Sequence, residues 1–153
     1  MKKSLLREQA KQIAKDCIAV RIRLLNRIVT NIYDTAMRPY GISLNQASIL
    51  TIITVNDGAG YGDICKILYM EKSTVSRTIE RMKKNGWIET MSGKDNGVTV
   101  VNITLAGERI LEKAYLAWAQ AQEEATRCLG QEGVAASMKV AESFWPMGKI
   151  QEG

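Results

Sequence analysis

Two short helical patterns separated by only three residues constrain the fold of this chain most. Apolar residues at helical spacing predict one helix over 63–68 and a second helix that begins at Lys72. The second helix carries its apolar stripe at Val75, Ile79 and Met82. Such a pair predicts a helix-turn-helix, in which the second helix buries one side and leaves the other side free.

After Asn85-Gly86, a helix end signal, the spacing of apolar residues changes from helical to alternating. Runs over 87–91 and 98–103 flank a segment rich in glycine and containing Asn96-Gly97, which suits a hairpin tip. We therefore expect a two-stranded ribbon, and we expect the glycine-rich stretch 58–62 to be a plain connecting turn. A helix-turn-helix followed by a hairpin describes a winged helix.

Long helical patterns flank this unit. One opens at Ser4 as the N-cap and ends at Arg38-Pro39, and another begins after the N-cap Ser43. Thr104 is predicted to cap a long helix, which a shorter helix follows from about Val134 until Pro146. The first helix has an apolar stripe at Ile13, Cys17, Val20, Leu24 and Ile28. The long helix after Thr104 has one at Leu111, Ala114, Trp118, Ala121, Ala125 and Cys128.

Composition excludes several classes of protein. The 153 residues include no histidine, which removes the commonest general base and metal ligand, and the three cysteines stand apart, outside any CxxC pair. We therefore expect no enzyme, no metal and no cofactor. The sequence has neither a signal peptide pattern nor an apolar run that could span a membrane, so a soluble, cytoplasmic protein is expected. The net charge of +5 is compatible with a polyanionic partner.

The free side of the helix from Lys72 carries cations and hydroxyl groups. Arginine can bind a guanine edge with two hydrogen bonds, serine and threonine can reach bases or phosphates, and further cations can reach the DNA backbone. A solvated helix face with no partner is the plain alternative for this helix taken alone. The candidate DNA-binding residues are Lys72, Ser73, Thr74, Ser76, Arg77, Arg81, Lys84 and, at the wing tip, Lys94.

Four segments resemble the MarR family of transcriptional regulators: Tyr40–Gln46, Glu71–Arg77, Arg81–Ile88 and Val101–Gly107. The resemblance implies a homodimeric repressor or activator that binds a pseudo-palindromic operator in double-stranded DNA and that a small ligand or thiol oxidation releases. Of the two, we expect a repressor. It also implies that Ser73, Thr74 and Arg77 contact bases or phosphates.

Two positions depart from the family's pattern. The wing of similar proteins carries an Asp-x-Arg segment, and here Asp95 is present without the arginine, so base discrimination is expected to rest on the helix. Tyr69 stands in the turn where the family often has glycine, and we expect it to strain that turn or to rotate the helix slightly.

The predicted fold class is mainly α with a small β-hairpin: a winged helix-turn-helix domain over 41–104, an N-terminal dimerisation helix over 1–37 and C-terminal dimerisation helices over 105–153. The stripe after Thr104 could equally line the core of one chain, but the resemblance favours a seam between two subunits. A ligand site is expected near Tyr33, Met37, Tyr40 and Trp118, and a redox site at Cys17 and Cys128. The alternative function is a winged-helix module that binds proteins and not DNA.

Overall fold

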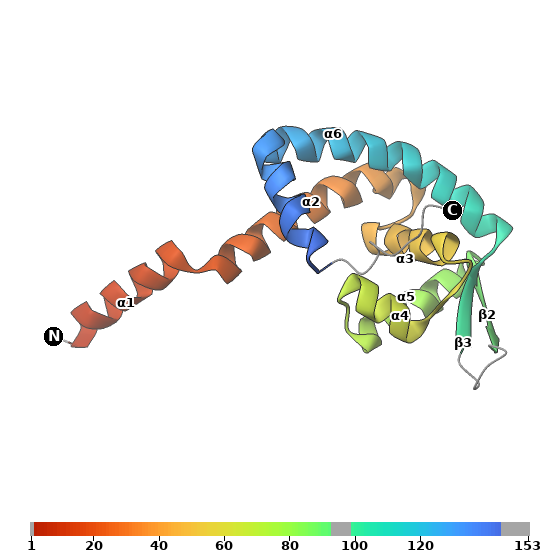
Figure 1. The fold of residues 1–153 in the computed structure, drawn as a ribbon, viewed down its shortest axis with the longest axis horizontal. Coiled ribbons are helices and arrows are strands. Elements are labelled where there is room, and N and C mark those ends of the chain that lie inside the picture. The colour runs from red at the N-terminus through yellow and green to blue at the C-terminus, as the bar shows by residue number, and fades with distance from the viewer. Residues whose placement is uncertain (1, 93–98, 145–153) are drawn as a thin grey trace.

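The computed structural model describes residues 2–92 and 99–144. In chain order the helices and strands are α1 (Lys2–Asp16), α2 (Ile18–Met37), the 3-10 helix η1 (Arg38–Tyr40), α3 (Leu44–Val55), β1 (Ala59–Gly60), α4 (Tyr61–Leu68), α5 (Lys72–Lys84), β2 (Ile88–Ser92), β3 (Thr99–Ile103) and α6 (Leu105–Glu142). A head of short helices and strands lies under the long helices α2 and α6, and α1 projects away from this body (Figure 1).

The predicted N-terminal helix is broken into α1 and α2 at Cys17, whose backbone is extended (φ −69°, ψ 107°). Ser4 lies inside α1 and is not an N-cap, so that assignment was wrong. The Arg21 guanidinium donates hydrogen bonds to the carbonyl oxygens of Ala14 (3.4 Å) and Cys17 (3.1 Å) and so stabilises the break. The apolar stripe continues across Cys17, and for that reason periodicity alone did not reveal the break.

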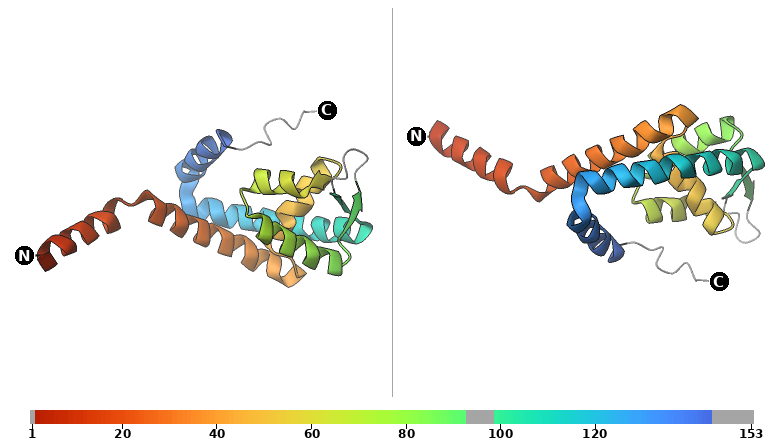
Figure 2. Two further views of the ribbon diagram at one scale, coloured as in Figure 1. Left: turned by 90° about the horizontal axis from the view of Figure 1, so that it is seen from below. Right: turned by 90° about the horizontal axis from the view of Figure 1, so that it is seen from above.

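The helix α6 packs along α2, as both views in Figure 2 show. The Tyr33 hydroxyl on α2 donates a hydrogen bond to the side-chain oxygen of Gln122 on α6. Small residues of α6 permit the close approach and are buried within the single chain: Ala114, Ala117, Ala121 and Ala125. The alanines of the predicted intersubunit seam therefore belong to the core of one chain, and the seam assignment is wrong for them.

At Gly130 the backbone leaves helical geometry (φ 70°, ψ 161°), and the rest of α6 bends sharply away from the direction of its first part (Figures 1 and 2). The expected last helix therefore starts directly after Gly130 and not near Val134. Glycine suits this position because a positive φ is costly for residues that carry a Cβ. Pro146, which was expected to disturb the helix, lies outside the described residues.

Local sequence signals position α3 as expected. The Ser43 hydroxyl accepts a hydrogen bond from the Gln46 backbone N–H, and the Gln46 side chain accepts one from the Ser43 N–H, forming a capping box. The Leu44 N–H donates to the Asp34 carboxylate at 2.7 Å and so joins α3 to α2. The largest side chains buried in the core, all less than 2% exposed, are Met37, Ile49, Leu50, Ile53, Ile64, Val75, Ile79, Met82 and Val101.

The sheet has three antiparallel strands in the order β1-β3-β2. Thr90 of β2 and Ala59 of β1 both pair with Val101 of β3. The prediction of a two-stranded ribbon was therefore one strand short, and Ala59 and Gly60 are not part of a plain turn. A strand of two residues has no alternation that a sequence pattern could display, since it exists only through pairing with β3.

None of the helices in the described part of the chain is both long enough and apolar enough to cross a membrane.

Candidate nucleic-acid interface

Helix α5 is fixed to the head by one side. Val75, Ile79 and Met82 are each 0% exposed, which confirms the predicted apolar stripe. Thr78 is buried beside them, and its hydroxyl donates to the Thr74 carbonyl oxygen at 2.8 Å, so that no buried polar atom of this side chain lacks a partner. The position and rotation of α5 are therefore set by its packing.

The opposite side of α5 faces away from the core. Thr74 and Ser76 are half-buried, and the other candidates on this helix are exposed: Lys72, Ser73, Arg77, Arg81 and Lys84. The helix carries five cations, the fifth being Lys83, against the single acid Glu80. Within residues 2–92 and 99–144 no ion pair involves a cation of α5. The helix thus presents a positively charged face whose charges are not neutralised inside the described chain.

Lys83 has a structural contact that the sequence did not reveal. Its Nζ atom donates to the Thr90 hydroxyl oxygen at 3.0 Å and so connects the end of α5 to strand β2. The wing therefore starts from a position tied to α5. The wing-tip candidate Lys94 and the neighbouring Asp95 lie outside the described residues.

The turn between α4 and α5 contains Tyr69 in the left-handed backbone region (φ 51°, ψ 40°). The backbone N–H groups of Tyr69 and Met70 both donate hydrogen bonds to the Cys65 carbonyl oxygen and so cap the C-terminal end of α4. Left-handed geometry is costly for a residue with a Cβ, so Tyr69 strains the turn, as the sequence predicted. The Tyr69 side chain is 75% exposed and contributes little packing in return.

Glu80 acts on the adjoining helix α4. Partial burial raises the pKa of the Tyr61 hydroxyl above its ordinary value, and the negative charge of Glu80 raises this pKa further. The first turn of α4 thus lies within electrostatic reach of Glu80 on α5.

A cavity of about 500 Å³ lies between the head and the long helices. Its lining comes from α2, α3, the last residue of α4 and α6: Met37, Leu44, Ala47, Ser48, Thr51, Ile52, Leu68, Leu111, Ala114, Tyr115 and Trp118. Of the four residues expected at a ligand site, Met37 and Trp118 line this cavity. Tyr33 instead bonds Gln122, with burial raising the pKa of its hydroxyl, and Tyr40 is exposed at the end of η1.

The two cysteines expected at a redox site are both free thiols and differ in exposure. Cys17 is half-buried at the break between α1 and α2, whereas Cys128 is exposed near the end of the first part of α6. In the described part of the chain no three potential metal ligands from histidine, cysteine, aspartate and glutamate gather at one place.

The chain is similar to known proteins in sequence and in fold. Residues 40–96, which include α3, α4, α5 and β2, match the family model described as MarR family. Over this segment the chain is similar to the MarR family. A curated relative is 26% identical over 98 residues, covering 64% of this chain and 72% of the relative, which is an uncharacterised HTH-type transcriptional regulator, YwoH, of Bacillus subtilis.

Solved structures show the same fold over most of the chain. A mutant of MarR from E. coli, complexed with operator DNA, is 19% identical, covers 88% of this chain and 97% of that chain, and superposes with a TM-score of 0.76. The transcriptional regulator MosR of M. tuberculosis, in complex with DNA, is 26% identical, covers 84% of this chain and 98% of that chain, and has a TM-score of 0.68. The predicted winged-helix fold class is confirmed.

Proposed function

We propose that this protein is a regulator of the MarR family, a homodimeric repressor that binds a pseudo-palindromic operator in double-stranded DNA through α5. The observation that carries the proposal is the two-sided character of this helix: a stripe that is 0% exposed fixes it, and cations and hydroxyls occupy its free side. The DNA-bound state of two structural relatives supports the same function. In this arrangement a dimer presents two such helices about one turn of DNA apart.

Three side chains of α5 are assigned to base recognition. Arg77 is exposed at the middle of the free side, where a guanidinium can bind the two acceptors of a guanine, and Ser73 and Thr74 lie one turn earlier. We assign phosphate contacts to the remaining candidates, Lys72, Ser76, Arg81, Lys84 and Lys94, because cations and hydroxyls around a reading helix commonly contact the backbone.

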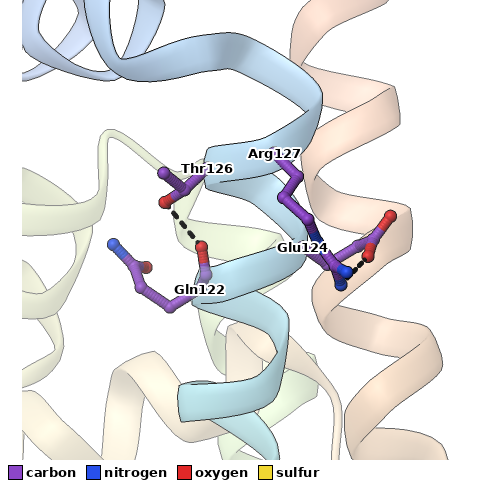
Figure 3. Close-up of polar contacts among 4 residues, drawn as sticks. All are labelled: Gln122, Glu124, Thr126 and Arg127. Carbon is purple, nitrogen blue, oxygen red and sulfur yellow. Dashed lines mark hydrogen bonds and ion pairs between the residues drawn. The ribbon is translucent and has the colours of Figure 1, made fainter.

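The test uses duplexes selected by the parent protein from a random library, with affinity measured by fluorescence anisotropy. Arg77→Ala is expected to weaken binding to the selected duplex by about tenfold to a hundredfold and to abolish its preference over random duplex. Arg127→Ala is the matched control. Arg127 lies on α6 and pairs with Glu124, while the neighbouring Thr126 hydroxyl bonds the Gln122 carbonyl oxygen within the same helix (Figure 3).

The proposal predicts that the control binds DNA as the parent does, with affinity that falls steeply as salt rises. If the parent selects no duplex from the random library, the proposal of sequence-specific DNA binding is wrong. A winged-helix module that binds proteins then becomes the better interpretation. If a duplex is selected and Arg77→Ala binds it like the parent, the assignment of base recognition to α5 is wrong.

We assign dimerisation to 1–37 and 105–153, and exposed apolar side chains on the N-terminal helices support the first of these segments. Leu5, Leu6, Ile13, Ile18, Val20, Ile22, Leu24 and Leu25 are all more than 40% exposed in the single chain. The 15-residue helix α1 projects into solvent, although isolated helices of this length are marginally stable in water (Figure 2). A second copy of the chain that covers these side chains would both bury the exposed apolar surface and stabilise α1.

Leu24→Glu tests this interface, since Leu24 is 56% exposed on α2. The variant is expected to sediment as a monomer at concentrations where the parent sediments as a dimer, because burying an unpaired carboxylate opposes association. Val55→Glu, at a site 46% exposed at the end of α3, is the matched control and should remain dimeric. A dimeric Leu24→Glu variant, or a monomeric parent, would contradict the assignment.

We assign relief of repression to a small ligand in the 500 Å³ cavity, because its walls include both long helices and the head. Leu68 of this wall is the last residue of α4, directly before the turn that leads to α5. A ligand that moves Leu68 therefore changes the placement of α5. Oxidation of Cys17 or Cys128 is the alternative trigger, and unchanged operator affinity in the presence of peroxide would exclude it.

A further inference from the structure

We propose that the hydroxyl group of Tyr69 donates a hydrogen bond to a phosphate of the DNA backbone, at the edge of the groove that α5 enters. This inference deepens the proposed function and rests on it for the placement of α5 in the major groove. It adds the turn between α4 and α5 to the surface that contacts DNA.

The Tyr69 side chain is free to meet a partner. It is 75% exposed, the highest fraction among the large apolar and aromatic side chains of residues 2–92 and 99–144. Within the same residues its hydroxyl forms no hydrogen bond, in contrast to the Tyr33 hydroxyl, which bonds Gln122. The folded chain therefore leaves the hydrogen-bond donor of Tyr69 available.

The backbone of Tyr69 is held in a conformation that its own side chain disfavours. The left-handed geometry (φ 51°, ψ 40°) would be free of strain only for glycine. Two hydrogen bonds to the Cys65 carbonyl oxygen, from the N–H groups of Tyr69 and Met70, impose this geometry on the turn. A strained residue whose side chain adds no packing points to a function of that side chain outside the chain.

The position of the turn identifies the part of DNA that Tyr69 meets. In a docked helix-turn-helix, the first helix crosses the DNA backbone, and the second lies in the major groove with its N-terminal residues at the base edges. Helices α4 and α5 lie side by side, and the turn joins them at one end (Figure 2). Tyr69 stands three residues before Lys72, the first residue of α5. The turn thus passes the edge of the groove, where the partner is the sugar-phosphate backbone.

The charges around Tyr69 favour an anionic partner. Lys66 and Lys72, each three residues away, are exposed, and Glu71 is the acid between them. Neither lysine forms an ion pair inside the described part of the chain. Tyrosine is among the side chains that bind phosphate oxygens, and a hydrogen bond to an ionised acceptor is stronger than one to a neutral acceptor. A phosphate therefore suits this site better than a neutral protein surface does.

The first experiment measures DNA affinity by fluorescence anisotropy with the full chain. Tyr69→Phe removes the hydroxyl and keeps the ring, and it should weaken binding by about threefold to tenfold. The loss should be the same for a selected duplex and for random duplex, because a backbone contact carries no sequence information. The slope of log affinity against log salt should not change, since the variant removes no charge.

Tyr40→Phe is the matched control. Tyr40 is also exposed, but it lies at the end of η1, which packs against α2 and α6. This variant should bind DNA as the parent does. Affinity of Tyr69→Phe equal to that of the control would overturn the proposal. A loss confined to the selected duplex would place the hydroxyl at a base, and it would overturn the phosphate contact as well.

The second experiment locates the phosphate. Phosphates of the duplex are replaced one at a time by uncharged methylphosphonates, and the affinities of the parent and of Tyr69→Phe are compared. At one phosphate of each half-site the replacement should weaken the parent and leave Tyr69→Phe almost unaffected, because the variant already lacks this contact. At the other phosphates both proteins should lose affinity equally. Equal losses at every phosphate would contradict the contact.

A purely structural role of Tyr69 predicts a different result. Tyr69→Phe keeps the Cβ and the strained backbone, so its urea unfolding midpoint should match that of the parent. Tyr69→Gly relieves the strain and lacks the hydroxyl, so it should bind DNA more weakly than the parent although its fold is the more stable. If Tyr69→Gly binds DNA as tightly as the parent, the proposal is wrong.

The same measurements separate this inference from the proposed function. If the parent selects a duplex and Tyr69→Phe binds it like the parent, only the Tyr69 contact is wrong. If the parent binds random duplex but selects none, the proposed operator recognition is wrong, and the loss in Tyr69→Phe on random duplex still decides the Tyr69 contact. A parent that binds no duplex overturns both.

Discussion

Replacing Tyr69 with glycine should stabilise the protein. Tyr69 adopts φ 51° and ψ 40° in the turn between α4 and α5, and this left-handed geometry costs a residue with a Cβ about 1–2 kcal/mol. Glycine adopts this geometry without strain. The greater freedom of glycine in the unfolded chain, however, lowers the free energy of unfolding by about 0.4–1 kcal/mol. The side chain is 75% exposed, so its removal sacrifices little buried surface. The net expectation is a gain of about 0.5–1 kcal/mol in the free energy of unfolding.

The assay is urea unfolding followed by circular dichroism, at one protein concentration for all variants, because association shifts apparent stability. Tyr69→Ala is the matched control, since it removes the same side chain but keeps a Cβ in the strained position. We expect the glycine variant to be more stable than the parent and the alanine variant to be no more stable than the parent. Equal stability of the two variants would refute the argument from backbone strain.

Three further substitutions test the packing of α6 and α5 and the cap of α3. Gly107→Ala would place a Cβ in collision with the Trp87 carbonyl oxygen and 2.7 Å from Ile103 Cγ1, so urea unfolding should show a loss of about 1–3 kcal/mol in the free energy of unfolding. Gly62→Ala, which has open space around it, is the control and should show no loss. Equal stability of the two variants would contradict this expectation. Ile79→Ala removes a side chain that is 0% exposed and should cost about 2–5 kcal/mol; a loss below 1 kcal/mol would mean that this side of α5 is not tightly packed. Ser43→Ala removes the capping box of α3 and should cost about 1 kcal/mol in the same assay, and an unchanged midpoint would deny the cap a stabilising role.

Local signals in the sequence determined most of the winged helix. Helix caps and helix ends depend on residues only a few positions apart, so they can be predicted from the sequence alone. This applies to the caps at Ser43 and Thr104 and to the helix end at Asn85-Gly86. The stripe of Val75, Ile79 and Met82 fixed the rotation of α5 and hence the candidate reading face.

Features that depend on distant partners were missed or misassigned. The two residues of β1 become a strand only because β3 lies beside them, and the Lys83 contact to Thr90 requires the wing to fold back onto α5. The lining of the cavity joins Ser48 and Thr51 of α3 with Trp118 of α6, residues far apart in the chain, and of the four residues expected at a ligand site only Met37 and Trp118 line it.

The packing of the long helices α2 and α6 could be predicted only in part from the sequence. The sequence by itself determined that Ala114, Ala121 and Ala125 form one apolar stripe, because helical periodicity is a local property. Only the tertiary structure decided what covers that stripe: α2 of the same chain packs against α6 and leaves other apolar side chains, such as Leu24, exposed. A stripe of small residues fits a helix of its own chain or of a second chain equally well, since close packing depends on shape and not on connectivity.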